Sequence, residues 1–207
     1  MPELVPAILI GAAAGAALAI PVQLLCSFLL RRRSLSWQFE PKHRVILFVS
    51  MALFGGVIGW RTGISFRGLY LLLLLLPAAV AFITDAIHRI IPNEAVLAIL
   101  ALAAVFGFAG AIPFEIVSSL IGLAVCFVVF FVPGLFGKSI GPGDVKLAAA
   151  MGFALGFAGS LYAIVGMGVL ILGYMLVTRS APVPEMLKKM IPMGPFLALA
   201  LVIVAIL

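Results

Sequence analysis

Long apolar runs without charge, separated by short charged clusters, dominate this sequence and restrict what the chain can fold into. Hydrophobic residues occupy 65% of the 207 positions and charged residues only 10%, against roughly 25% in ordinary soluble domains. So few charges cannot cover the surface of a soluble protein of this size, which excludes a soluble enzyme, a disordered chain and a disulfide-rich secreted module. The sequence therefore predicts an all-α polytopic membrane protein, with residues 1–207 forming a single transmembrane domain.

About eight transmembrane helices are expected, because a bilayer core about 30 Å thick needs about 20 apolar residues per helix. The stretch 147–178 carries no charge and is too long for one span, and Gly152, Gly156, Gly159 and Ser160 offer a turn near its middle. We therefore predict two short spans there. The other spans lie at about 5–30, 45–60, 68–84, 94–111, 116–136 and 190–207.

The distribution of basic residues predicts the orientation of these spans. Cytoplasmic loops of membrane proteins collect Lys and Arg. With eight spans, all of the 13 basic residues except Arg61 and Arg67 fall on one side. This arrangement predicts both termini outside and a short cytoplasmic loop at about 31–44. The net charge of +6 is then an orientation signal, and no nucleic-acid partner is expected.

Both aspartates of the chain, Asp85 and Asp144, fall where a predicted span meets a predicted cytoplasmic loop. An ionisable group at membrane depth is costly and marks a candidate functional site. For each aspartate alone, a helix cap or a solvated interfacial position explains it equally well. After Asp85, Pro92 is expected to break the helix, with Asn93 as the N-cap of the next helix and Glu94 in its first turn.

The second aspartate follows a glycine-rich turn. Gly141 and Gly143 let the backbone come close to another segment, and Asp144 sits at or beside a helix start. Two carboxyl groups that meet share a proton, so that one activates a water while the other polarises a carbonyl. Asp85 and Asp144 share a membrane face in the predicted topology. Lys146 is either a ligand for a substrate carboxylate or an orientation charge.

Three segments together resemble the bacterial type IV prepilin peptidases, in the order of that family, over about 80–200. The segments are Asp85 with Ile91-Pro92-Asn93, then Gly141-x-Gly143-Asp144-x-Lys146, and then the stretch 191–198 with Pro192, Gly194 and Pro195. The resemblance implies a GxGD-type aspartic peptidase of the bacterial inner membrane, mechanistically similar to presenilin. It implies that Asp85 and Asp144 are catalytic at the cytoplasmic boundary and that the other motif residues shape the site or bind substrate. For 192–195, the alternatives are an irregular helix start and a backbone wall beside the active site.

The same resemblance implies a prepilin or pseudopilin precursor as the substrate partner, while the oligomeric state is not specified by any of these features. Many bacterial members carry a larger cysteine-containing cytoplasmic domain and also methylate the product with S-adenosylmethionine. The loop at about 34–44 has no cysteine, so a compact, cleavage-only enzyme without a cofactor is expected. No metal is expected either, because two His and two isolated Cys form no ligand motif. The alternatives are a bifunctional peptidase and N-methyltransferase, and a small-solute transporter.

Overall fold

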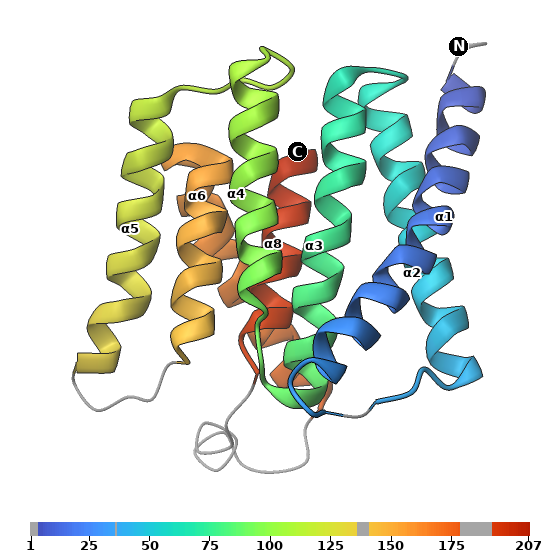
Figure 1. Ribbon diagram of the computed structural model, residues 1–207. Coiled ribbons are helices and arrows are strands. Elements are labelled where there is room, and N and C mark those ends of the chain that lie inside the picture. Colours follow the sequence, from blue (N-terminus) through green and yellow to red (C-terminus); the bar gives the residue numbers. More distant parts are fainter. Residues whose placement is uncertain (1–3, 36, 136–140, 179–191) are drawn as a thin grey trace.

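The computed structural model describes residues 4–35, 37–135, 141–178 and 192–207, and all regular secondary structure within them is helical (Figure 1). The seven helices of these residues are α1 (Leu4–Arg31), α2 (Pro41–Thr62), α3 (Phe66–His88), α4 (Asn93–Phe108), α5 (Ile116–Leu135), α6 (Pro142–Val177) and α8 (Gly194–Ile206). Five of them, α1, α2, α3, α5 and α6, are long and apolar enough to cross a membrane, and α4 and α8 are shorter apolar helices. The prediction of an all-helical polytopic membrane protein is confirmed.

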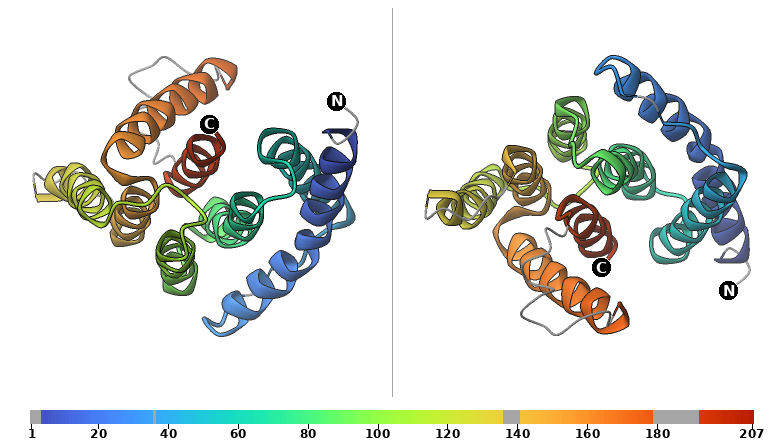
Figure 2. Two further views of the ribbon diagram at one scale, coloured as in Figure 1. Left: turned by 90° about the horizontal axis from the view of Figure 1, so that it is seen from above. Right: turned by 90° about the horizontal axis from the view of Figure 1, so that it is seen from below.

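The helices form two outer pairs with three helices between them. Figures 1 and 2 show α1 with α2 on one side, α5 with α6 on the other, and α3, α4 and α8 in the middle. In the first pair the backbones touch, because a Cβ added to Gly15 or Gly55 would overlap backbone atoms of the opposite helix. Small residues allow such close approach between membrane helices, where packing rather than hydrophobic burial drives association.

The predicted turn within 147–178 is present, at Gly156. The backbone of α6 leaves the helical conformation there, with φ 69° and ψ −177°, a combination that glycine adopts without strain. Figure 1 shows the chain turning back at this point, so that α6 consists of two arms, 142–155 and 157–177. The hydroxyl of Ser118, on α5, accepts a hydrogen bond of 3.0 Å from the Phe157 N–H and so caps the start of the second arm.

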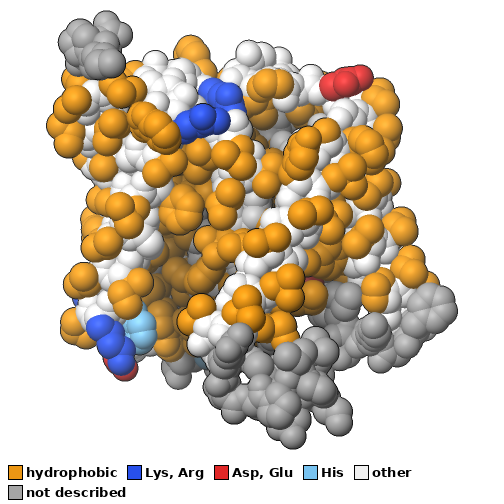
Figure 3. Space-filling model, turned by 180° about the vertical axis from the view of Figure 1, so that it is seen from behind, with side chains coloured by type: hydrophobic (Ala, Val, Ile, Leu, Met, Phe, Trp, Pro, Cys, Tyr) orange, Lys and Arg blue, Asp and Glu red, His pale blue; other side chains and the backbone are white. Residues whose placement is uncertain are grey.

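Charged side chains lie at the two ends of the bundle, and apolar side chains cover the flank between them (Figure 3). Arg61 and Arg67 donate hydrogen bonds to the backbone oxygens of Leu207 (2.8 Å) and Ala205 (3.4 Å), which places the C-terminus at their end. The beginning of α1 lies toward the same end in Figure 1. The number of crossings and the side on which the termini lie stay predictions.

Some predicted boundaries were wrong by several residues. Helix α2 begins at Pro41 rather than at about 45, because proline fits the first turn of a helix, where no N–H donor is needed. Residues 41–44, which were predicted to belong to the loop, therefore form the first turn of α2. Four basic residues that were predicted to be cytoplasmic lie outside the described residues, as does Ile191 of the third motif; they are Lys138, Arg179, Lys188 and Lys189.

Candidate active site

Asp85 lies in the last helical turn of α3 rather than in the loop that the sequence predicted, because the helix continues to His88. The helix ends at Arg89, which adopts the left-handed conformation (φ 55°, ψ 39°) and donates its N–H to the Asp85 carbonyl. Pro92 is thus not what ends this helix. As a result Asp85 is held by regular structure, and it is only 5% exposed.

The Asp85 carboxylate is held in place by the first residue of α8. The backbone N–H of Gly194 donates a hydrogen bond of 2.9 Å to Asp85 Oδ2. A Cβ at Gly194 would lie 2.7 Å from this oxygen and 2.8 Å from Asp85 Cγ, so only glycine leaves room for the carboxylate. Pro195 follows in the first turn of α8 and Pro192 precedes it. The alternative of a backbone wall beside Asp85 therefore describes the stretch 192–195 better than an irregular helix start alone.

Asp144 is the third residue of α6, where the sequence predicted a helix start. Its N–H donates to the Gly141 carbonyl at 3.0 Å, and a Cβ at Gly141 would lie 3.0 Å from Asp144 Oδ2. The other carboxylate oxygen, Oδ1, is buried and has no hydrogen-bond partner among the described residues. A buried acceptor without a protein partner is costly. This oxygen is therefore available to a water or a substrate.

Two contacts bring the start of α6 to the connection between α3 and α4. Gly143 packs against Ile91, since a Cβ on the glycine would lie 3.1 Å from Ile91 Cβ. Lys146 Nζ donates to Asn93 Oδ1 at 3.2 Å. The prediction of Asn93 as the helix N-cap was wrong, because Pro92 takes the N-cap position and Asn93 is the first helical residue. Its amide is instead the partner of Lys146.

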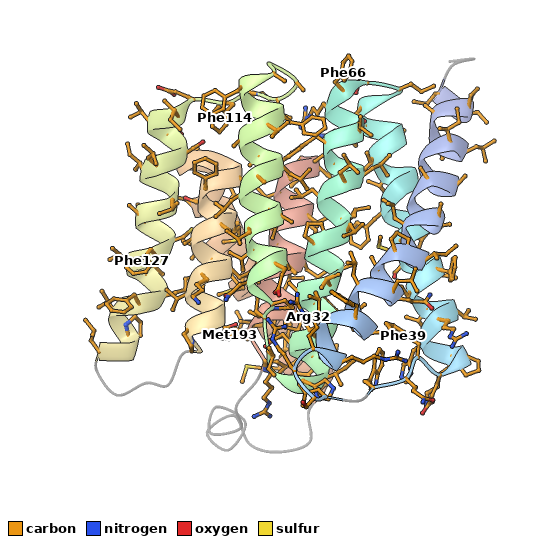
Figure 4. All side chains as sticks on the ribbon, viewed as in Figure 1. Arg32, Phe39, Phe66, Phe114, Phe127 and Met193 are labelled. Atoms are coloured by element: carbon orange, nitrogen blue, oxygen red, sulfur yellow. The ribbon has the colours of Figure 1, made fainter. Side chains whose placement is uncertain are left out.

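The two carboxyl groups share one electrostatic environment, although 59 positions separate them in the sequence. The charge of Asp85 acts repulsively on the Asp144 carboxyl, and the positive charge of Arg89 acts on Asp85. Figure 4 labels Met193 at the lower end of the bundle, and the next residue, Gly194, is the one whose N–H contacts Asp85. Asp85 is buried and Asp144 is partly buried, and two such carboxyl groups in one electrostatic environment can hold one proton between them, as acid–base chemistry requires.

Glu94 stands apart from this pair. Its carboxylate forms a 3.2 Å ion pair with Arg33, and the two side chains are 49% and 30% exposed. It lies in the first turn of α4, as predicted, where the helix dipole favours an anion. Within the described residues, no three His, Cys, Asp or Glu side chains gather into a group that could hold a metal ion.

All ten motif residues that the sequence singled out lie at one end of the bundle, but the sequence missed how they connect. The bond from Gly194 to Asp85 and the bond from Lys146 to Asn93 join residues 109 and 53 positions apart. A chain segment rich in proline and glycine was the only signal for the first bond. No signal in the sequence paired Lys146 with Asn93.

Comparison with known proteins gives one match. The model of the type IV leader peptidase family matches residues 70–176, a range that contains Asp85 and Asp144 and ends before α8. No curated protein and no solved structure matches the chain. Because the matched range covers just over half of the 207 residues, the chain belongs to the type IV leader peptidase family, whose members are aspartic peptidases.

Proposed function

We propose that this protein is a membrane-embedded aspartic endopeptidase that removes the leader peptide of type IV prepilin-like precursors, with Asp85 and Asp144 as its catalytic pair. One observation carries the proposal: the Gly194 N–H holds the Asp85 carboxylate at 2.9 Å, and Asp144, at the start of α6, keeps a buried oxygen with no partner among the described residues. Membership of the type IV leader peptidase family supplies the substrate class.

The carboxyl pair supports hydrolysis by an acid–base mechanism. The ionised carboxyl takes a proton from a water, whose oxygen adds to the scissile carbonyl carbon. The protonated carboxyl donates its proton to the carbonyl oxygen. Collapse of the tetrahedral intermediate then breaks the C–N bond as a proton passes to the leaving amine. The hydrogen bond from Gly194 keeps the Asp85 carboxylate in one orientation throughout.

In the membrane, we propose eight spans with both termini outside, the two arms of α6 crossing separately. The basic run at Arg31–Arg33 then faces the cytoplasm of a bacterial cell, since basic loops stay inside. The carboxyl pair lies near that same boundary. A precursor with an apolar helix would place this helix among those of the enzyme and its scissile bond beside Asp85 and Asp144.

The short connection between α1 and α2 favours cleavage alone over a bifunctional peptidase and N-methyltransferase. It runs from Arg32 to Glu40 and contains no cysteine. Cys26 and Cys126 are both buried in helices as free thiols. A small-solute transporter is disfavoured because its site would lie near the bilayer midplane, whereas both aspartates lie toward one end of the bundle.

Co-expression with a prepilin-like precursor tests the proposal by the size shift of the cleaved product. We expect Asp85→Asn and Asp144→Asn each to nearly abolish cleavage, because an amide cannot exchange the proton. The double variant should be little worse, because the two groups act as a unit.

Glu94→Gln is the matched control, because it also removes one carboxylate at this end of the bundle. Its half-exposed ion pair with Arg33 is worth at most about 1 kcal/mol, so cleavage should stay near normal. Substantial cleavage by either aspartate variant would show that the pair is not catalytic. A dead Glu94→Gln enzyme would show that Glu94 is the carboxylate needed beside α4.

A further inference from the structure

A pocket of about 410 Å³ lies between the end of α1 and the start of α2, and neither Asp85 nor Asp144 lines it. Pro21 lies inside α1, and Figure 1 shows α1 leaning away from α2 beyond its middle. Proline commonly bends a helix in this way, because it removes one backbone hydrogen bond. The bend separates the two helices at the end where Arg31 and Arg44 lie, and the pocket occupies the space between them.

One wall of the pocket is a polar stripe on an otherwise apolar helix. Gln23, Ser27 and Arg31 follow each other at intervals of four residues, which places them on one face of α1, and all three line the pocket. Polar side chains in a membrane helix are costly when they face lipid tails, and they are usually found against a polar cavity. The stripe therefore indicates that this face of α1 contacts a polar ligand.

The opposite wall adds a second cation. Arg44, in the first turn of α2, donates from Nε to the Phe39 carbonyl at 3.0 Å, which fixes the guanidinium beside the pocket. Neither Arg31 nor Arg44 has a carboxylate partner within the described part of the chain. Two glutamates at this end of the bundle have other partners: Glu40 pairs with Lys42, and Glu94 pairs with Arg33.

The neutral polar side chains of the pocket are also unpartnered. Among the described residues, no hydrogen bond engages the side chains of Gln23, Ser27 or Gln38. Apart from the Arg44 Nε–H, which donates to Phe39, the two guanidinium groups, two amides and one hydroxyl of the pocket have no acceptor among the described residues. A phosphate oxygen is the acceptor that arginine pairs bind best, by charge-assisted hydrogen bonds.

We propose that this pocket binds the phosphate-bearing headgroup of an anionic phospholipid. A lipid is favoured over a free phosphate because the pocket also has an apolar side, formed by Leu24, which is 66% exposed on the flank of α1, and by Trp37. Tryptophan is enriched at membrane–water interfaces. The headgroup lies between Arg31 and Arg44, and the acyl chains run along Leu24. This site does not depend on the peptidase proposal.

Trp37 provides a direct probe of the pocket. The chain has two tryptophans, and Trp60 lies near the other end of α2, so Trp60→Phe leaves Trp37 as the only indole. The purified protein is reconstituted in phosphatidylcholine vesicles that contain increasing fractions of phosphatidylglycerol with brominated acyl chains, which quench nearby indoles. We expect half-maximal quenching at about a tenfold lower fraction than with brominated phosphatidylcholine, because the guanidinium groups bind only the anionic headgroup tightly.

Three arginine variants distinguish specific binding in the pocket from general attraction between basic residues and anionic lipids. Arg31→Gln and Arg44→Gln should each reduce the lipid preference to about twofold or less, because each removes a charge-assisted hydrogen bond. Arg32→Gln removes the same charge from the same run, but its guanidinium lies over the Phe28 ring, 5.4 Å from the centroid, and does not line the pocket. It should keep the preference.

A further variant tests the polar stripe without changing any charge. Gln23→Leu makes a membrane helix more apolar, so it should insert normally, and it should still weaken the preference for phosphatidylglycerol. Equal quenching by the two brominated lipids would overturn the proposal, as would an equal loss with Arg32→Gln. Loss of the preference when inorganic phosphate is added at millimolar concentration would identify a free anion as the ligand and would overturn the lipid assignment.

Discussion

The contact between Gly194 and Asp85 gives the sharpest prediction for the peptidase. In a Gly194→Ala variant the new Cβ would lie 2.7 Å from Asp85 Oδ2, whereas ordinary contact begins at 3.4 Å. The carboxylate must therefore move by about 0.7 Å. A displacement of about 1 Å in a reacting group can cost 100-fold in rate, so we expect cleavage to fall by roughly 30- to 100-fold, or about 2 to 3 kcal/mol in activation free energy.

Folding should survive this change. Gly194 has no positive φ, and alanine is the better helix former by about 1 kcal/mol. Two matched variants complete the series. Gly141→Ala places its Cβ 3.0 Å from Asp144 Oδ2, so the shift is about 0.4 Å and the loss of rate should be smaller. Gly166→Ala, in α6, has no atom within 4 Å of the new Cβ and should cleave normally.

The assay is the initial rate of cleavage of a purified prepilin-like substrate in detergent, with the melting temperature of each variant as the check on folding. The expected order of rates is Gly166→Ala, then Gly141→Ala, then Gly194→Ala. A Gly194→Ala enzyme with wild-type rate and normal stability would refute the argument, because the Asp85 carboxylate would then have no need of its present position.

Four further outcomes are expected. Gly156→Ala should lower the free energy of chemical unfolding by about 1 to 3 kcal/mol, because a side chain at φ 69° is strained and its Cβ would lie 2.9 Å from Ser118 Oγ. A variant as stable as the wild type would contradict the turn at Gly156. A cysteine at Ser65 should react with an impermeant thiol reagent from outside intact cells, and one at Ser34 only after permeabilisation; the reverse pattern would invert the topology. Cleavage should survive EDTA, and loss with rescue by zinc would refute an aspartic mechanism. Mass spectrometry should find an unmodified N-terminus on the product, and an added methyl group that depends on S-adenosylmethionine would show a second activity.

The helical architecture was predictable because it follows from a single physical requirement. Lipid offers no hydrogen-bond partners, so each apolar run must satisfy its backbone within a helix. The turn in α6 was also predictable, since its residues were too many for one span and contained glycines. Helix ends were predicted less well, because they depend on local capping. Arg89 ends α3 in a left-handed conformation that its residue type does not indicate.

The composition of the candidate site was more predictable than its geometry. The sequence showed Asp85 and Asp144 at two span boundaries, and the resemblance joined them to the motif at 191–198. The partner of each polar group was not predictable, because the hydrogen bonds of Asp85 and Lys146 cross between helices that are distant in the sequence. Asn93 is an example of what residue type alone does not predict. Asparagine favours the N-cap position, but Asn93 is the first helical residue of α4 and its amide accepts a hydrogen bond from Lys146 in α6.

The hydrogen bond between Gly194 and Asp85 has a consequence for how the protein is made. The two residues are 109 positions apart, and translation adds about 5–20 residues per second. Asp85 is therefore synthesised roughly 5 to 20 s before the backbone group that holds its carboxylate. Asp144 is added 59 residues after Asp85, so for the last 50 residues of this interval the nascent chain carries both aspartates without the N–H that holds Asp85. If Asp85 and Asp144 are the catalytic pair that we propose, the site is complete only once α8 has been made and inserted.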